Sequence, residues 1–282
     1  MSFYQRILKG CFAVGFAVVV ALAAAATAFP QTKTTAPFSF SRGEELIYQA
    51  EFSRALLRGV DVAEFRFTSI SENISRGTGK DETPIVRLTG DVKSKGFFLR
   101  LVGFSFHQRV ESVAELEPFT VLKTRKLEEQ GKRIRDLDAV FDHEVRKVTW
   151  TIRDSNQAQA PQASTTDFSE PIQDVLTVIY FLRTQKLEPG KSFEVPISDA
   201  GRVFTMSVNA VERKELSTVL GRVKTVRVEP ALFGDTRLVR ARGALSIWLT
   251  DDDRHIPVRA QLKVEIGTFD IKLKRLSDFR PN

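Results

Sequence analysis

The feature that most constrains the fold is a long alternation of apolar and polar residues in the last part of the chain. From Ile256 to Ile266, eleven residues, every second side chain is apolar and most of the others are charged or polar. Successive side chains of a β-strand point to opposite faces, so the alternation predicts a strand with one apolar and one wet face. Typical strands have only about five or six residues, so this one is unusually long.

The same alternation recurs along most of the chain. Alternating stretches cover residues 46–52, 63–68, 86–92, 204–210, 245–249 and 269–273. Long strands with one polar face are typical of antiparallel sheets, and a hydrophobic content of 42% is enough for a substantial core. We therefore predict a mainly β protein, built as a curved antiparallel sheet or incomplete β-barrel with one main α-helix packed in its concave face.

One stretch has helical spacing instead. Apolar residues recur there every three or four positions, at Ile172, Val175, Leu176, Ile179 and Leu182. This spacing predicts a helix over residues 169–186. The preceding residues 154–168 are rich in Gln, Ala and Ser and are predicted to form a loop. We expect the loop and the helix to join two β-rich halves of a single domain, residues 43–282.

The N-terminus has the pattern of an export signal. The basic residues Arg6 and Lys9 precede an almost unbroken apolar run from Cys11 to Ala26, which ends in small residues. A membrane span needs about 20 apolar residues, so this run predicts a cleaved signal peptide over residues 1–28, with an uncleaved anchor as the alternative. We expect a periplasmic protein, in which residues 29–42, rich in Thr, Pro and Ser, form a flexible leader.

Charge and metal-binding residues exclude several classes of function. The formal net charge is +7, but the basic runs at 123–126, 132–135 and 237–242 are interleaved with acids. A nucleic-acid site would need a concentrated basic patch, so we expect solvated strand faces, and peripheral contact with a membrane stays chemically open. Three scattered histidines and one cysteine give no metal-binding spacing, and no motif predicts a cofactor.

Three adjacent carboxylates, Asp251 to Asp253, form the sharpest polar cluster. They lie between two predicted strands, where aspartate commonly stabilises a turn by accepting backbone hydrogen bonds. The alternative is a cation site or a catalytic pair formed by Asp251 and Asp253. Known calcium loops alternate their oxygen ligands along the chain, and this cluster does not, so a turn is the favoured interpretation.

Phenylalanine is unusually frequent, with 22 copies. Four of these residues, Phe97, Phe98, Phe104 and Phe106, lie within ten positions of one another. Together with Val175 and Ile179 of the predicted helix, they are candidates for lining a cavity that binds an apolar or amphipathic ligand. The alternative is that these side chains fill the core of a large sheet.

Three blocks of sequence carry a family resemblance. They are Gly43 to Tyr48, Gln173 to Arg183 followed by Leu187 to Gly190, and Ile247 to Asp252 followed by Ile256 to Arg259. In this order they resemble the bacterial envelope family known as domain of unknown function 3108. The resemblance implies an exported protein without an assigned activity, and it transfers no functional residue. In general shape the family is similar to the lipoprotein-carrier type of fold, an open curved sheet partly plugged by a helix.

These observations predict a non-enzymatic envelope protein that binds or carries an apolar or amphipathic ligand, or that maintains the outer membrane. One alternative is a hydrolase or carbohydrate-active enzyme that uses carboxylates such as Asp251 and Asp253. A second alternative is an interaction module that binds another envelope protein through an exposed strand edge.

Overall fold

The computed structural model describes residues 38, 40, 43–75, 82–96, 103, 105–157, 160–169, 171–234 and 242–278. The predicted signal peptide lies outside these residues. The described chain forms fourteen strands and the helix α3 (Thr177–Thr184). The strands are β1 (Glu44–Arg54), β2 (Leu57–Ser75), β3 (Glu82–Ser94), β4 (Phe106–Leu116), β5 (Phe119–Gln130), β6 (Arg133–Asp142), β7 (Lys147–Asp154), β8 (Gln162–Asp167), β9 (Ser192–Asp199), β10 (Arg202–Thr218), β11 (Gly221–Pro230), β12 (Gly243–Thr250), β13 (Pro257–Val264) and β14 (Gly267–Asp278).

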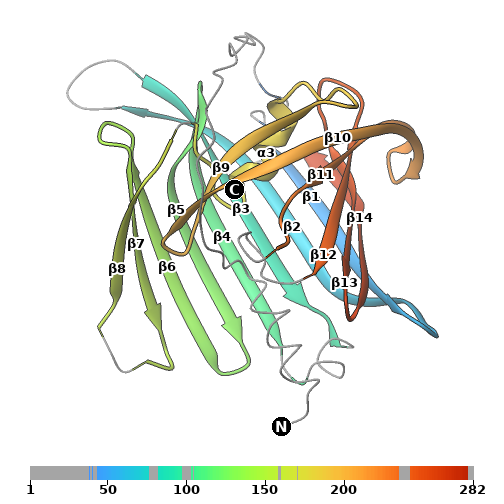
Figure 1. Ribbon diagram of the computed structural model, residues 1–282, viewed down its shortest axis with the longest axis horizontal. Helices are drawn as coiled ribbons and strands as arrows, with labels where there is room; N and C mark the ends of the chain where they lie inside the picture. The colour runs from blue at the N-terminus through green and yellow to red at the C-terminus, as the bar shows by residue number, and fades with distance from the viewer. Residues whose placement is uncertain are drawn as a thin grey trace.

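All the strands belong to one antiparallel sheet with the order β8-β7-β6-β5-β4-β3-β2-β1-β14-β13-β12-β11-β10-β9. The first eight strands and the last six are two meanders, which join where β1 pairs with β14. Figure 1 shows the sheet curving around α3, with β8 and β9 as its two edges. The predicted fold class, an open curved antiparallel sheet with one helix in its concave face, is confirmed.

Pairing between neighbouring strands places the apolar faces in register. Across β13 and β14, Ala260 pairs with Ile271 and Leu262 pairs with Phe269, while Ala260 also pairs with Ile247 on β12. A shift of one residue would turn these side chains to the opposite face, so burial of the apolar face fixes the register. The alternation seen in the sequence thus becomes a continuous apolar concave surface.

The helix is shorter than predicted. Helix α3 begins at Thr177, and the residues before it adopt extended and turn conformations instead of the helix expected from residue 169. The amide of Val121 donates to the carbonyl of Ile172, and Gln173 forms a parallel bridge with Ile197 of β9. Because these backbone groups bond to the sheet, they are not available for helical hydrogen bonds. The segment therefore links the β5 and β9 parts of the sheet.

Two other expectations are corrected. The predicted loop 154–168 contains the edge strand β8, which pairs with β7. Its Thr residues favour a strand, but the segment has no alternation of apolar and polar residues. Phe40 belongs to the predicted flexible leader, yet its ring is buried against Phe119 and Tyr180. An aromatic ring of this size is stabilised by burial, which holds this residue against the core.

Candidate functional site

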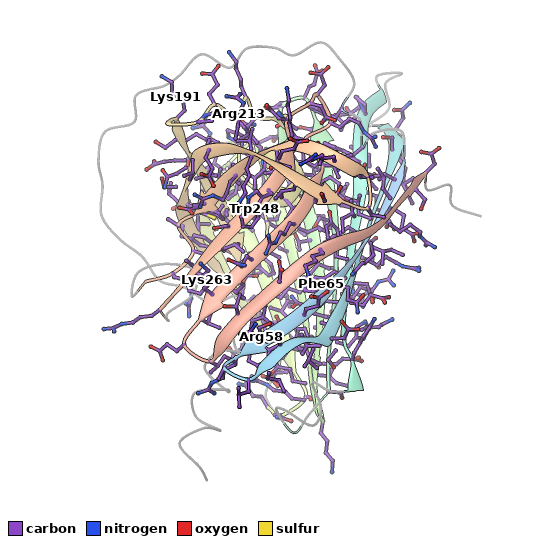
Figure 2. The ribbon with its side chains drawn as sticks, turned by 90° about the vertical axis from the view of Figure 1, so that its right-hand side faces the viewer. Arg58, Phe65, Lys191, Arg213, Trp248 and Lys263 are labelled. Atoms are coloured by element: carbon purple, nitrogen blue, oxygen red, sulfur yellow. The ribbon has the colours of Figure 1, made fainter. Side chains whose placement is uncertain are left out.

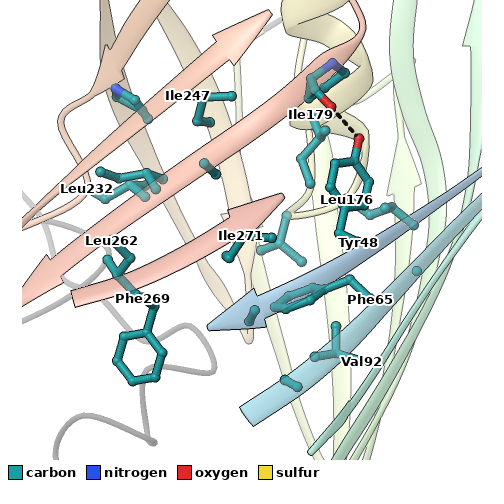
Figure 3. A pocket seen from close by; sticks show the side chains of 18 of the residues that line it. Tyr48, Phe65, Val92, Leu176, Ile179, Leu232, Ile247, Leu262, Phe269 and Ile271 are labelled. Carbon is teal, nitrogen blue, oxygen red and sulfur yellow. Dashed lines mark hydrogen bonds between the residues drawn. The ribbon is translucent and has the colours of Figure 1, made fainter. Parts of the chain in front are cut away.

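The concave face of the sheet encloses a cavity of about 420 Å³ beside α3. This volume lies in the range of about 300–1,000 Å³ that is typical of small-molecule sites. The close-up in Figure 3 shows side chains from β1, β2, β13 and β14 pointing into it, with Leu176 and Ile179 on the helix side. The cavity is therefore built from segments at both ends of the chain.

The walls of the cavity are almost entirely apolar. Residues from ten strands, the helix segment, the residues that follow β11 and the β13–β14 turn line it: Tyr48, Ala50, Val62, Ala63, Phe65, Phe67, Gly90, Val92, Ser94, Phe106, Gln108, Val110, Val175, Leu176, Val178, Ile179, Leu182, Ile197, Met206, Pro230, Leu232, Phe233, Leu245, Ile247, Pro257, Arg259, Ala260, Leu262, Val264, Ile266, Phe269 and Ile271. Tyr48 donates its hydroxyl hydrogen to the carbonyl of Pro257 at 2.7 Å, so this polar group is already satisfied.

The cavity exists because the helix covers only part of the concave face. Leu176 and Leu182 complete a tightly packed core with strands on both sides. By contrast, Phe65, Leu262 and Ile271 lie on the same concave face but keep part of their surface accessible. Apolar surface left in contact with water is unfavourable, by roughly 25 cal/mol per Å². A ligand with an apolar body would remove this surface from water.

Gly90 lets the helix segment approach the sheet. A Cβ atom at this position would lie 3.1 Å from the ring of Phe67 and 3.2 Å from a methyl group of Leu176. These distances are shorter than ordinary van der Waals contacts, so a larger side chain would push the helix segment or the ring away. The glycine thus lets Leu176 and Phe67 pack closely against β3 in the cavity lining.

Three of the six predicted site residues lie in this lining, namely Phe106, Val175 and Ile179. The other three, Phe97, Phe98 and Phe104, lie outside the described residues. A ligand-binding role for the six residues stays a prediction. The sequence patterns do not identify most of the lining residues as part of a cavity. The strand alternation does predict that Phe65 and Leu262 lie on an apolar face.

A buried ion pair fixes α3 to β1. The Arg183 Nη2 atom donates to Glu44 Oε2 at 3.1 Å, and its Nε atom donates to the carbonyl of Arg254 at 3.1 Å. The guanidinium group also lies 5.0 Å from the centre of the Phe40 ring. Burial alone would lower the pKa of Arg183, but the hydrogen bond and charge of Glu44 outweigh burial and raise it. The arginine stays charged.

A second buried charge cluster joins β5 to β9. The Lys126 Nζ atom lies 2.9 Å from both Asp199 Oδ1 and Glu128 Oε1, and all three side chains are almost inaccessible. Burial raises the pKa of Asp199 to about 6, although Lys126 opposes this shift. The expected solvated face is therefore wrong for Lys126. The Lys126 side chain is buried on the concave face of the sheet. Of the basic run at 237–242, only Arg242 belongs to the described residues.

Asp174 caps the turn before α3. Its Oδ1 atom accepts hydrogen bonds from the amides of Leu176 and Thr177 at 2.8 and 2.7 Å. Its Oδ2 atom accepts hydrogen bonds from the hydroxyl groups of Ser112, at 2.5 Å, and Thr124. A fully buried carboxylate with four donors is satisfied by its partners, so it positions the helix and does not point to chemistry at this residue.

The aspartate cluster forms a turn between β12 and β13. Asp252 Oδ1 accepts from the amides of Arg254 and His255, both at 3.2 Å. Asp251 pairs with Arg213 at 2.9 Å, and Asp253 is exposed. The alternative of a catalytic pair is thus without support from the geometry at this turn. Within the described ranges, no group of three or more His, Cys, Asp or Glu residues is arranged to hold a metal ion.

His107 lies between two carboxylates that are distant in sequence. Its Nε2 atom is 3.0 Å from Asp91 Oδ2, and its Nδ1 atom is 2.8 Å from Glu129 Oε2. Burial lowers the pKa of His107, but both hydrogen bonds oppose this effect, and the net result is a raised pKa. The three residues come together through pairing of β3, β4 and β5, which no local sequence motif shows.

The comparisons with known proteins agree with this architecture. The profile of the family described as Protein of unknown function (DUF3108) matches residues 48–274. The chain belongs to this family. No curated protein matches it in sequence. In the described part of the chain, no helix is long and apolar enough to span a membrane.

A solved structure shares the fold of this DUF3108 protein. It is the crystal structure of a β-barrel-like protein of domain of unknown function DUF1849 from Brucella abortus, with a TM-score of 0.51 and 12% sequence identity. The match covers 85% of this chain and 98% of that chain. At this identity the similarity shows the fold alone. The open, curved sheet is thus shared beyond the family, and it agrees with the resemblance to the lipoprotein-carrier type of fold.

Proposed function

We propose that this DUF3108 protein is an exported, non-enzymatic binding protein, which holds the apolar part of an amphipathic ligand such as an acyl chain in its concave cavity. The observation that supports this function is the cavity of about 420 Å³ with its apolar lining. The N-terminal sequence pattern supports export to the periplasm.

The chemistry of the walls favours a chain-like apolar ligand. The lining has few polar groups, and the Tyr48 hydroxyl is already bonded to Pro257. A ligand with polar groups along its whole length would lose hydrogen bonds to water without replacing them, at a cost of roughly 1–3 kcal/mol for each group. An acyl chain has no such groups, and its burial is favourable by about 0.8 kcal/mol per CH₂.

The test is a titration with cis-parinaric acid, a fatty acid that becomes fluorescent in an apolar site. The informative variant is Ala260→Phe, which puts a ring into the cavity from β13. The matched control is Ala244→Phe on the neighbouring strand β12, where the side chain is exposed and lies outside the lining. Both variants add the same ring to an alanine of the same sheet.

We expect the unmodified protein and Ala244→Phe to bind the probe with similar affinity, and Ala260→Phe to bind at least tenfold more weakly. In parallel, native mass spectrometry of protein purified from its own envelope should show a copurifying lipid. Equal binding by the two variants would place the probe outside the cavity, and absence of probe binding by the unmodified protein would overturn the proposal.

A further inference from the structure

We propose that the tip of the β1–β2 hairpin, residues 54–58, is a membrane-docking site that inserts Leu56 into the headgroup region of an anionic lipid bilayer. This inference extends the proposed function, because membrane lipids carry the acyl chains that the cavity is proposed to bind.

Leu56 is fully exposed at the end of a two-residue turn. Arg54 pairs with Leu57 across the hairpin, and Ala55 has a positive φ of 47°, so the turn is tight. The amide of Gly59 donates to Ser53 Oγ at 3.0 Å, which ties the two strands together just behind the tip. The structure thus holds a large apolar side chain out in solvent on a supported turn, where burial of that side chain in lipid would be favourable.

The tip lies at the same end of the sheet as one wall of the cavity. The next residue, Leu57, packs against a buried cluster that includes Ala50, Val62 and Ile266. These three residues also line the cavity. The apolar surface therefore continues from the tip through Leu57 to the cavity wall. A bilayer that contacts Leu56 would lie next to this wall of the cavity.

The charge of the tip fits an anionic surface. Leu56 is flanked by the exposed side chains of Arg54 and Arg58. Figure 2 shows Arg58 and Lys263 toward the same end of the molecule, far from Arg213. Each basic side chain near an anionic membrane contributes about 1 kcal/mol of attraction. Isolated leucines are common on protein surfaces, but this one has two arginine neighbours and an apolar connection to the cavity.

Carboxylates near the tip reduce this positive charge, and Glu51 Oε2 lies 3.8 Å from the position that a Cβ atom would take on Gly59. Asp61 and Glu265 are exposed at this end of the sheet, and Glu64 lies 3.3 Å from Lys95. Neither residue next to the Ala55–Leu56 turn is acidic. The side chains closest in sequence to Leu56 that could contact anionic headgroups are thus the basic ones of Arg54 and Arg58.

The experiment is cosedimentation of the processed chain, residues 29–282, with vesicles of phosphatidylethanolamine and phosphatidylglycerol, and with vesicles of phosphatidylcholine alone. The test variants are Leu56→Asp and the double variant Arg54→Gln/Arg58→Gln. The matched control is Val219→Asp, because Val219 is exposed in the β10–β11 turn. That turn lies at the start of β11, whereas the end of β11, Pro230, lines the cavity. All the substituted side chains are exposed, so the fold should tolerate them.

We expect the unmodified protein and Val219→Asp to bind the anionic vesicles equally, and Leu56→Asp to bind about tenfold more weakly, since burial of a leucine is worth about that factor or more. The double arginine variant should bind weakly and lose its salt dependence. Equal binding to both vesicle types, equal binding by Leu56→Asp, or self-association through the tip in place of vesicle binding would overturn the inference.

The two proposals fail separately in these experiments. Leu56→Asp should bind cis-parinaric acid in solution as the unmodified protein does, whereas Ala260→Phe should keep its vesicle binding and lose the probe. If the cavity binds no ligand, the vesicle assay still tests the hairpin directly. If the vesicles do not bind, the probe titration still tests the cavity.

Discussion

Disruption of the Arg183–Glu44 ion pair should destabilise the protein more than any surface charge change, because this pair fixes α3 above the cavity. The guanidinium of Arg183 is 1% exposed and the carboxylate of Glu44 is 6% exposed. Substitution Arg183→Met keeps most of the apolar stem but removes the charge. It leaves the buried Glu44 carboxylate and the carbonyl of Arg254 without their donors.

The magnitude follows from the cost of an unpaired buried charge. Removal of one partner from a buried ion pair costs about 3–5 kcal/mol, which is a large part of a total stability of about 5–15 kcal/mol. In a domain of this size each kcal/mol lowers the melting temperature by about 2–4 °C. Arg183→Met should therefore lower it by roughly 6–20 °C. Glu44→Met should have a similar effect, because it leaves Arg183 unpaired.

A double-mutant cycle separates the charge effect from packing. In Arg183→Met/Glu44→Met neither charge remains, so the double variant should be less destabilised than the sum of the two single changes by at least about 2 kcal/mol. Urea unfolding followed by tryptophan fluorescence gives the free energies. Additive losses, or a loss below about 1 kcal/mol for either single variant, would refute the reasoning.

Further predictions concern the other charged groups. The pKa of Asp199, raised to about 6 by burial, lies above its unfolded value of about 3.8, so its contribution to stability falls as pH rises through this window. The stability difference between the unmodified protein and Asp199→Asn should therefore shift toward the unmodified protein by up to about 3 kcal/mol between pH 7 and pH 4; a pH-independent difference would contradict this. For His107, an NMR titration should give a midpoint above 6.5, and the Asp91→Asn variant should lower it; an unchanged midpoint would exclude the carboxylate as the cause. Asp252→Ala should cost about 1 kcal/mol in thermal unfolding because it removes two backbone hydrogen bonds, whereas Asp253→Ala should change stability by less than about 0.5 kcal/mol; equal effects would contradict the turn assignment.

Much of the sheet could be predicted because alternation is a local property of the sequence. The strand that contains Ala260 and Leu262 follows its period-two pattern, and the burial of one face then fixes its register. The sequence pattern did not predict edge strand β8, because polar residues occupy both of its faces and no alternation of apolar and polar residues results. Local patterns reveal strands that must bury one face, and they miss strands held mainly by backbone hydrogen bonds.

The start of the helix and the buried charges could not be predicted for a different reason. The apolar spacing around Ile172 is compatible with a helix, but contacts with distant strands take its backbone hydrogen bonds. Lys126 stands in a basic run, yet β5 turns it toward Asp199, which is 73 residues away. Arg183 and Glu44 are 139 residues apart. Such partners are determined by the order of the strands, which a single local window does not contain.

A crystal structure of the protein soaked with a brominated fatty acid would show directly whether the cavity holds an acyl chain. The concave face leaves apolar space that the protein's own side chains do not fill. Anomalous bromine density should lie in contact with Phe65, Leu262 and Ile271, between the sheet and α3. A concave face packed solid by protein side chains, or bromine bound only elsewhere on the surface, would contradict it.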